Sequence, residues 1–192
     1  MNNRRSGKSS YKRRSSKKSA KQKQQISEVT IEGLGPKGDG FSTDQLGRIY
    51  IDRSVPGDQL DIKFEGRADG TRQGEILRII SPSADRIKPA CEYYDVCGGC
   101  TLQHVSEEFY QNWKQTLVKE ALSRHNLEPE QTLPPLFLSS ANRRRVTFTA
   151  LKQNNGTVLL GYYQRRTKTI SDISHCLIAD ADIMKLHSVL KD

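Results

Sequence analysis

Hydrophobic and polar residues alternate in several short runs in the first half of the chain. Four such runs occupy residues 29–34, 47–52, 59–66 and 73–80. In the third run Leu60, Ile62 and Phe64 share one face, and this period of two is typical of half-buried strands. Turn-forming pairs such as Gly35-Pro36 and Pro56-Gly57 separate the runs. The pattern predicts four or five strands forming a small closed β-barrel of the OB kind over residues 26–84.

The periodicity becomes helical after residue 105. Apolar residues recur at helical spacing at Tyr110, Trp113, Leu117, Ala121 and Leu122. Ser106 is a suitable N-cap, and Glu107 and Glu108 lie where the helix dipole favours acids. A helix over residues 106–125 is therefore predicted, with Trp113 packed in a core.

Two further strand patterns follow at residues 143–152 and 157–164. Asn154-Asn155-Gly156 lies between them, and Asn-Gly is a strong hairpin signal. Asp180 can cap a final helix. The expected fold class is α+β, with the barrel followed by a small α/β domain over residues 85–192.

The positive charge of the protein is concentrated in residues 1–25. The chain carries a net charge of +9. The segment has no acid and ten cations, so the remaining residues sum to −1; the cations are Arg4, Arg5, Lys8, Lys12, Arg13, Arg14, Lys17, Lys18, Lys21 and Lys23. So little apolar content predicts a disordered tail, and the charge favours RNA as its partner. A solubilising tail without a partner, or a nuclear-address signal, stays open.

Composition argues against a membrane or secreted protein. No apolar run approaches the roughly 18 residues of a membrane span, and the polar N-terminus does not match a secretory signal. We therefore expect a cytoplasmic protein with reduced cysteines that are available to a metal.

Three of the four cysteines form the motif C-x5-C-x2-C, at Cys91, Cys97 and Cys100, and the fourth is Cys176. Thiolates are soft ligands that suit zinc or an iron–sulfur centre. Gly98 and Gly99 are expected to take positive φ angles and to point amides at the sulfurs. A single C-x2-C knuckle with a distant fourth cysteine favours [4Fe–4S] over the paired knuckles of zinc sites. Zinc, or no metal, remains an alternative.

The order of motifs resembles a known family. The barrel region resembles a TRAM domain at Gly35, Gly38, Gly40, residues 55–58 and 75–80, Pro82, Ser83 and Arg86. Together with C-x5-C-G-G-C-x-L-Q-H, it resembles the class I S-adenosylmethionine-dependent RNA 5-methyluridine methyltransferases, most closely the cluster-bearing 23S rRNA (uracil-C5) type. His175-Cys176-Leu177 matches the family's fourth cluster cysteine, which adds to the case for [4Fe–4S].

The resemblance implies a catalytic cysteine, a base and an S-adenosylmethionine site in a later domain. These 192 residues contain no glycine-loop unit for that cofactor, so we expect an RNA-recognition half that does not transfer methyl groups alone. The alternative is a stand-alone RNA-binding protein. An in-frame catalytic domain beyond residue 192 would exclude this alternative.

The expected partner is RNA, with 23S rRNA favoured, and the protein is expected to be a monomer. The expected phosphate-binding residues are cations of the C-terminal hairpin: Arg143, Arg144, Arg145, Arg165, Arg166 and Lys168. Phe148, Tyr162 and Tyr163 are candidates for stacking on bases. The alternatives are a solvated strand face for the cations and core packing for the aromatics.

Deleting residues 1–25 is expected to weaken RNA binding and to flatten its salt dependence. Each lost phosphate contact removes about 0.7–0.9 from the log–log slope. Titrating RNA at several salt concentrations measures that slope for both proteins. An unchanged slope would show that the tail does not contact RNA.

Overall fold

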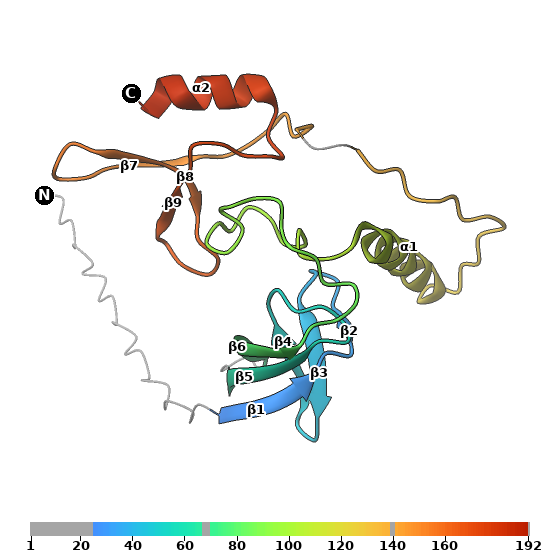
Figure 1. Ribbon diagram of the computed structural model, residues 1–192. Coiled ribbons are helices and arrows are strands. Elements are labelled where there is room, and N and C mark those ends of the chain that lie inside the picture. Colours follow the sequence, from blue (N-terminus) through green and yellow to red (C-terminus); the bar gives the residue numbers. More distant parts are fainter. Residues whose placement is uncertain (1–24, 67–69, 139–140, 192) are drawn as a thin grey trace, which may run out of the picture.

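The computed structural model describes residues 25–66, 70–138 and 141–191. These ranges contain two β-sheets and two helices, consistent with the expected α+β class. In Figure 1 the larger sheet lies at the bottom and the smaller at the top, with the cysteine segment between them. The predicted tail lies almost wholly outside the described residues. No helix in the described ranges is long and apolar enough to span a membrane.

The N-terminal sheet has six strands in the order β1-β5-β6-β4-β3-β2. They are β1 (Gln25–Thr30), β2 (Gly33–Leu34), β3 (Gly40–Asp44), β4 (Gly47–Ile51), β5 (Gln59–Gly66) and β6 (Arg72–Ser81). All pairings are antiparallel except the parallel pair β4–β6. The sheet curls into a half-barrel with β1 and β2 as its edges, so within the described residues it does not close into the predicted barrel.

The strand predicted over residues 29–34 is wrong as a single element. Ile31 accepts a backbone hydrogen bond from Gly57 and donates one to Asp58, while the Glu32 amide donates to Phe41 in β3. The chain thus stops pairing beside β5 at this point and crosses to pair with β3. Strand β3 was not predicted, since its sequence GFSTD is mostly polar.

The concave side of the sheet holds the principal core. Its buried residues are Ile31, Ile49, Ile51, Leu60, Ile62 and Phe64, with Val29 and Ile76 packed against them. The predicted apolar face of residues 59–66 is confirmed. Each fully buried side chain of this size stabilises the fold by about 1.5–3 kcal/mol.

The rest of the chain forms helix α1 (Glu107–Ser123), sheet β7-β8-β9 and helix α2 (Ala181–Lys191). The Ser106 cap is confirmed, because its hydroxyl accepts a hydrogen bond from the Phe109 amide. The expectation that Trp113 lies in a core is wrong, because no residue of α1 is buried and Trp113 is only half-buried. Figure 1 shows the reason: α1 projects to one side of the molecule, away from both sheets.

The second sheet consists of β7 (Thr149–Lys152), β8 (Val158–Tyr163) and β9 (Ile170–Asp172). The hairpin turn is confirmed: Gly156 has φ +87°, and the Asn155 side chain accepts from the Thr157 amide. The strand predicted over residues 143–152 forms only in its last four residues. Its beginning is diverted because the Arg143 amide donates to the Ile178 carbonyl, and the Arg143 carbonyl accepts from Asp180.

A buried ion pair joins the N-terminal sheet to the segment that follows it. Asp58 is fully buried and accepts hydrogen bonds from the Val55 and Ser83 amides, at 2.6 and 2.9 Å. The Arg86 guanidinium also donates to both Asp58 oxygens, at 2.5 and 3.0 Å. This carboxylate therefore fixes the turn before β5 and the exit from β6 together.

Replacing Asp58 with alanine is expected to lower the free energy of unfolding by about 3–5 kcal/mol, because Arg86 would keep a charge without a partner. Urea denaturation measures the change. Asp61→Ala is the matched control, since Asp61 pairs with the exposed Arg78 and its loss should cost about 1 kcal/mol or less. Equal losses in the two variants would contradict this role of Asp58.

Candidate metal centre

The four cysteines line one small cavity of about 20 Å³. Cys91, Cys97 and Cys100 come from the irregular segment between β6 and α1, and Cys176 comes from the loop after β9. All four are half-buried and unbonded to each other. The structure thus brings the distant fourth cysteine to the C-x5-C-x2-C motif, across 76 residues of chain from Cys100.

Hydrogen-bond donors surround the sulfurs. The Gly99 amide donates to Cys97 Sγ at 3.3 Å, and the Tyr162 hydroxyl lies 3.9 Å from Cys176 Sγ. Gln103 accepts from the Cys91 amide through its side-chain oxygen, and it also hydrogen-bonds to the Cys100 side chain. Donors of this kind stabilise negative charge on ligand sulfurs. Tyr162 and Gln103 were not predicted in this role.

Two of the four thiols, those of Cys97 and Cys100, resist ionisation when no metal is bound. Burial raises the pKa of the Cys97 thiol, and the nearby sulfurs of Cys176 and Cys91 raise it further. Burial likewise raises the pKa of the Cys100 thiol, and the other three cysteines raise it further. Four thiolates side by side therefore require a compensating cation, as a metal or cluster supplies.

The two glycines of the motif do not have the conformation that we expected. Neither is among the described glycines with positive φ. Gly98 instead permits a close approach: an added Cβ would lie 2.6 Å from the Tyr163 carbonyl oxygen. The Gly98 amide donates to that same oxygen at 2.9 Å. The absence of a side chain therefore lets the cysteine segment lie against the end of β8.

Two arginines hold the cysteine segment by its carbonyl groups. Arg53, from the loop after β4, donates to the carbonyls of Tyr94 and Asp95 at 2.5 Å each. Arg165, from the loop after β8, donates to the Cys100 carbonyl at 3.3 Å. Their sequence neighbourhoods gave no signal of this role, because each reaches a segment more than 40 residues away.

Tyr94, within the cysteine segment, and His104, just after it, are both buried. The Tyr94 hydroxyl donates to the Thr101 carbonyl and contacts His104 Nδ1, both at 2.6 Å. Burial lowers the pKa of His104 to about 4 and raises that of Tyr94 to about 12. Both side chains are uncharged at neutral pH, so neither adds charge beside the cysteines.

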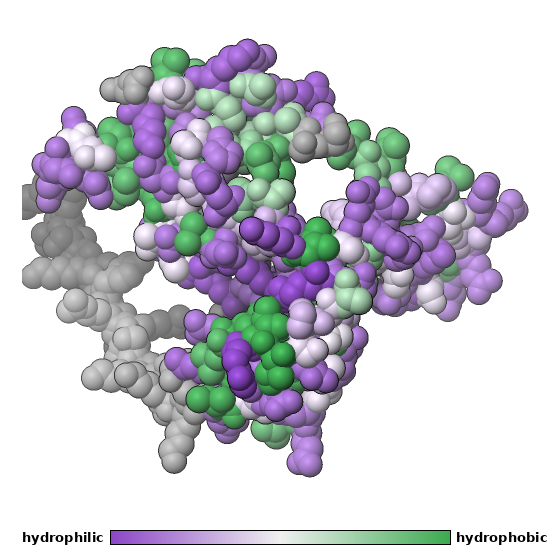
Figure 2. Space-filling model, in the orientation of Figure 1, coloured by the Kyte–Doolittle hydropathy of each residue, from purple (hydrophilic) through white to green (hydrophobic). Residues whose placement is uncertain are grey.

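A cluster of charges joins the N-terminal sheet to the second sheet. Arg165 lies 2.9 Å from Asp52 and 3.6 Å from Asp39, and Arg166 lies 2.9 Å from Asp52. The two carboxyl groups also hydrogen-bond to each other. In Figure 2 the region between the lower and upper lobes is correspondingly hydrophilic.

The two carboxyl groups of this cluster titrate differently. Burial, reinforced by the hydrogen bond and charge of Asp52, raises the pKa of Asp39 to about 6. Burial also opposes ionisation of Asp52, but the hydrogen bond from Asp39 and the charges of Arg165 and Arg166 lower its pKa overall. The pKa of Asp39 is thus raised and that of Asp52 lowered.

The expected RNA-binding cations fall into two groups. Arg165 and Arg166 pair with carboxylates of the N-terminal sheet, as described above. The exposed group consists of Arg143, Arg144 and Arg145, which lie before β7 rather than on the hairpin, and Lys168 between β8 and β9. Binding of RNA by either group stays a prediction.

The candidate stacking residues also divide. Phe148 packs against Tyr162 and His187, with ring centroids 5.2 and 4.8 Å apart. Tyr162 also lines the cysteine cavity. These two rings therefore belong to internal packing, whereas Tyr163 is 48% exposed.

Sequence comparison finds relatives that are named RNA methyltransferases. The chain is 36% identical over 157 residues to an uncharacterized RNA methyltransferase of Caulobacter vibrioides, covering 81% of this chain and 36% of that protein. It is 27% identical over 156 residues to the 23S rRNA (uracil(1939)-C(5))-methyltransferase RlmD of Alkalilimnicola ehrlichii. The match covers 80% of this chain and 35% of that protein. The chain therefore spans about a third of the length of these curated relatives. No protein-family model matches it.

Among solved structures the fold is similar to that of a Pyrococcus abyssi tRNA (uracil-54, C5)-methyltransferase in complex with S-adenosyl-L-homocysteine. The TM-score is 0.59 at 22% identity, over 85% of this chain and 35% of that one. At this identity the similarity shows a shared fold.

The Asp39–Asp52 pair predicts a pH dependence of stability. The pKa of Asp39 is raised from 3.8 to about 6 in the folded protein, so between these values the folded state binds more protons. The stability that protonated Asp39 contributes is fully present below pH 3.8 and is lost as the pH rises through about 6. Asp39→Asn removes this loss, and we expect the variant to be more stable near neutral pH by on the order of 1 kcal/mol.

Urea denaturation of both proteins across this pH range measures the difference in stability between them. Asp95→Asn is the control, because Asp95 is 91% exposed and should leave the wild-type profile unchanged. Parallel profiles for wild type and Asp39→Asn would refute the raised pKa of Asp39.

Proposed function

We propose that this chain is the RNA-recognition and [4Fe–4S] portion of an S-adenosylmethionine-dependent 23S rRNA (uracil-C5) methyltransferase. The observation that carries the proposal is the meeting of Cys176 with Cys91, Cys97 and Cys100 at one cavity. That meeting occurs in a chain whose relatives are named RNA methyltransferases. The motif resemblance and the shared fold support the same conclusion.

The donor set fits an iron–sulfur cluster better than a single zinc ion. Zinc needs its sulfurs about 2.3 Å from one point. Zinc sites usually pair two C-x2-C knuckles, whereas here one knuckle, Cys97 and Cys100, shares the cavity with the separate cysteines Cys91 and Cys176. A [4Fe–4S] cluster bonds each thiolate to a different iron and so accepts more widely spaced ligands.

The proposed cluster is structural. Held by Cys91, Cys97, Cys100 and Cys176, it would cross-link the segment before α1 to the loop after β9. A cluster so placed supplies iron–sulfur bonds and charge compensation for the thiolates. With all four cysteines of the chain committed to it, none is left to attack C6 of a uridine. We therefore propose that the chain binds RNA and transfers no methyl group alone.

Anaerobic purification followed by iron, sulfide and zinc analysis tests the metal assignment. We expect about four iron and four sulfide per chain, and their loss in Cys176→Ser. Ser174→Ala is the matched control two residues away and should retain the cluster. Stoichiometric zinc in a colourless protein would refute the proposed cluster.

RNA titration of the same anaerobic preparation tests the binding function. We expect binding to a 23S rRNA fragment that weakens steeply with salt, because phosphate contacts release counterions. No binding at low salt would refute the RNA-recognition role, whatever the metal content.

A further inference from the structure

Tyr50 lies on the outer face of the N-terminal sheet. Its neighbours in β4, Ile49 and Ile51, are buried in the core, so the alternation of the strand turns Tyr50 outward. The strand register places Phe41 of β3 on one side of Tyr50 and Gln73 of β6 on the other. Two aromatic rings and an amide therefore form a row across this face.

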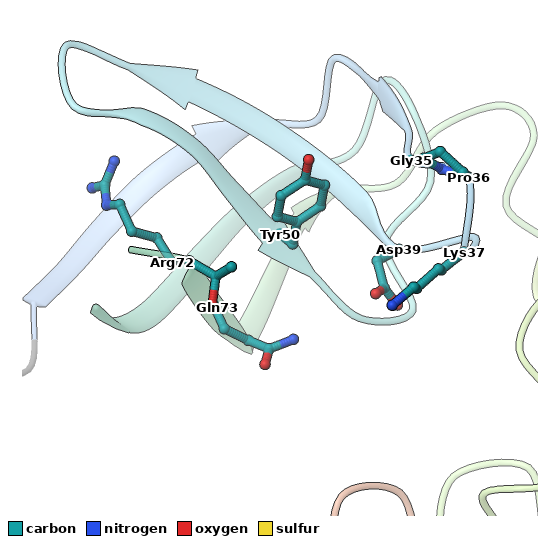
Figure 3. A pocket seen from close by; sticks show the side chains of 8 residues that line it. Gly35, Pro36, Lys37, Asp39, Tyr50, Arg72 and Gln73 are labelled. Carbon is teal, nitrogen blue, oxygen red and sulfur yellow. The ribbon is translucent and has the colours of Figure 1, made fainter. Parts of the chain in front are cut away.

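A pocket of about 350 Å³ opens beside this row, within the roughly 300–1,000 Å³ typical of ligand sites. Its lining residues are Gly35, Pro36, Lys37, Asp39, Tyr50, Thr71, Arg72 and Gln73. Figure 3 shows the Tyr50 ring between Arg72 and Gln73 on one side and the residue 35–39 loop on the other. The pocket thus has an aromatic wall with polar groups on both flanks.

The Tyr50 ring is held in place by its surroundings. A Cβ added to Gly35 would lie 3.2 Å from Tyr50 Cε1, so the glycine lets the loop pack against the ring. The Phe41 ring supports it in an edge arrangement, with the centroids 6.3 Å apart. Tyr50 is half-buried, so part of its ring remains accessible. A fixed, partly exposed ring is suited to stacking on a flat ligand at little entropic cost.

The flanking groups have the chemistry of nucleotide recognition. The Gln73 amide carries both donors and an acceptor, as a base edge requires. Lys37 is exposed and supplies a cation. Among the described lining residues Asp39 is the one acid, and Arg165 lies 3.6 Å from it. The charge balance of the pocket therefore tolerates a phosphate.

From this geometry we propose that the pocket is a nucleotide subsite for single-stranded RNA. An unpaired base stacks on Tyr50 with its edge toward Gln73, and its phosphate lies near Lys37. The subsite rests on the proposed RNA-binding function and specifies where one nucleotide would bind. No bond is made or broken there, so the subsite serves affinity and register.

Fluorescence anisotropy with a labelled single-stranded oligouridine of about 12 nucleotides tests the subsite in the full chain. Tyr50→Ala is expected to weaken binding by about tenfold or more, and Tyr50→Phe by no more than about twofold, because the phenyl ring still stacks. Lys37→Ala should weaken binding more than Lys88→Ala, which removes an exposed lysine outside the pocket. Unchanged binding in Tyr50→Ala would overturn the subsite.

Photocrosslinking of wild-type protein to 4-thiouridine RNA gives a readout that does not depend on variants folding. The subsite predicts a crosslinked peptide that contains Tyr50 or Gln73. Crosslinks confined to other peptides would overturn the subsite while leaving RNA binding intact. Failure of the wild type to bind any RNA would instead overturn the proposed function, and the subsite with it.

Discussion

The structure depends on the hydrogen bonds by which two arginines hold the carbonyl groups of the cysteine segment. This segment has no helix or strand of its own. Turn hydrogen bonds, such as that from the Cys97 amide to the Tyr93 carbonyl, satisfy part of its backbone, and the remaining groups need partners from elsewhere. Arg53 supplies them from the N-terminal sheet and Arg165 from the second sheet. Guanidinium groups suit this task because their planar donors can reach two acceptors at once. The backbone that carries the thiols is thus held from both sheets.

This arrangement changes how the basic residues are interpreted. Arg165 is 20% exposed and lies beside two carboxylates, so much of its charge is already compensated. A phosphate would have to compete with Asp52 for it. The cations before β7 and Lys168 are instead exposed to solvent. A basic residue in a strand pattern therefore does not reveal whether its charge serves a ligand or a contact between sheets.

Local patterns predicted what depends on local physics. The Ser106 cap, the Asn155-Gly156 turn and the alternating face of β5 follow from neighbouring residues, and each was predictable from the sequence. The ion pair between Asp52 and Arg165 joins residues 113 positions apart and left no periodic signal. The need for glycine at position 98 could not be predicted either, because it arises from the close approach of the Tyr163 carbonyl in the folded chain. The cysteine site was indicated by ligand chemistry, but the hydroxyl of Tyr162 near Cys176 required the folded chain.

The proposed cluster and the junction between the sheets are physically linked through Arg165. Asp39 and Asp52 repel each other once both ionise, and Arg165 lies near both. The same guanidinium donates to the carbonyl of Cys100, a proposed cluster ligand. A cluster that fixes Cys100 would therefore also fix an acceptor for Arg165, and would favour the position in which this arginine compensates the carboxylates. The cluster would then stabilise the docking of the N-terminal sheet as well as its own loop. This link gives a physical reason why the proposed RNA-recognition region would hold the proposed structural cluster.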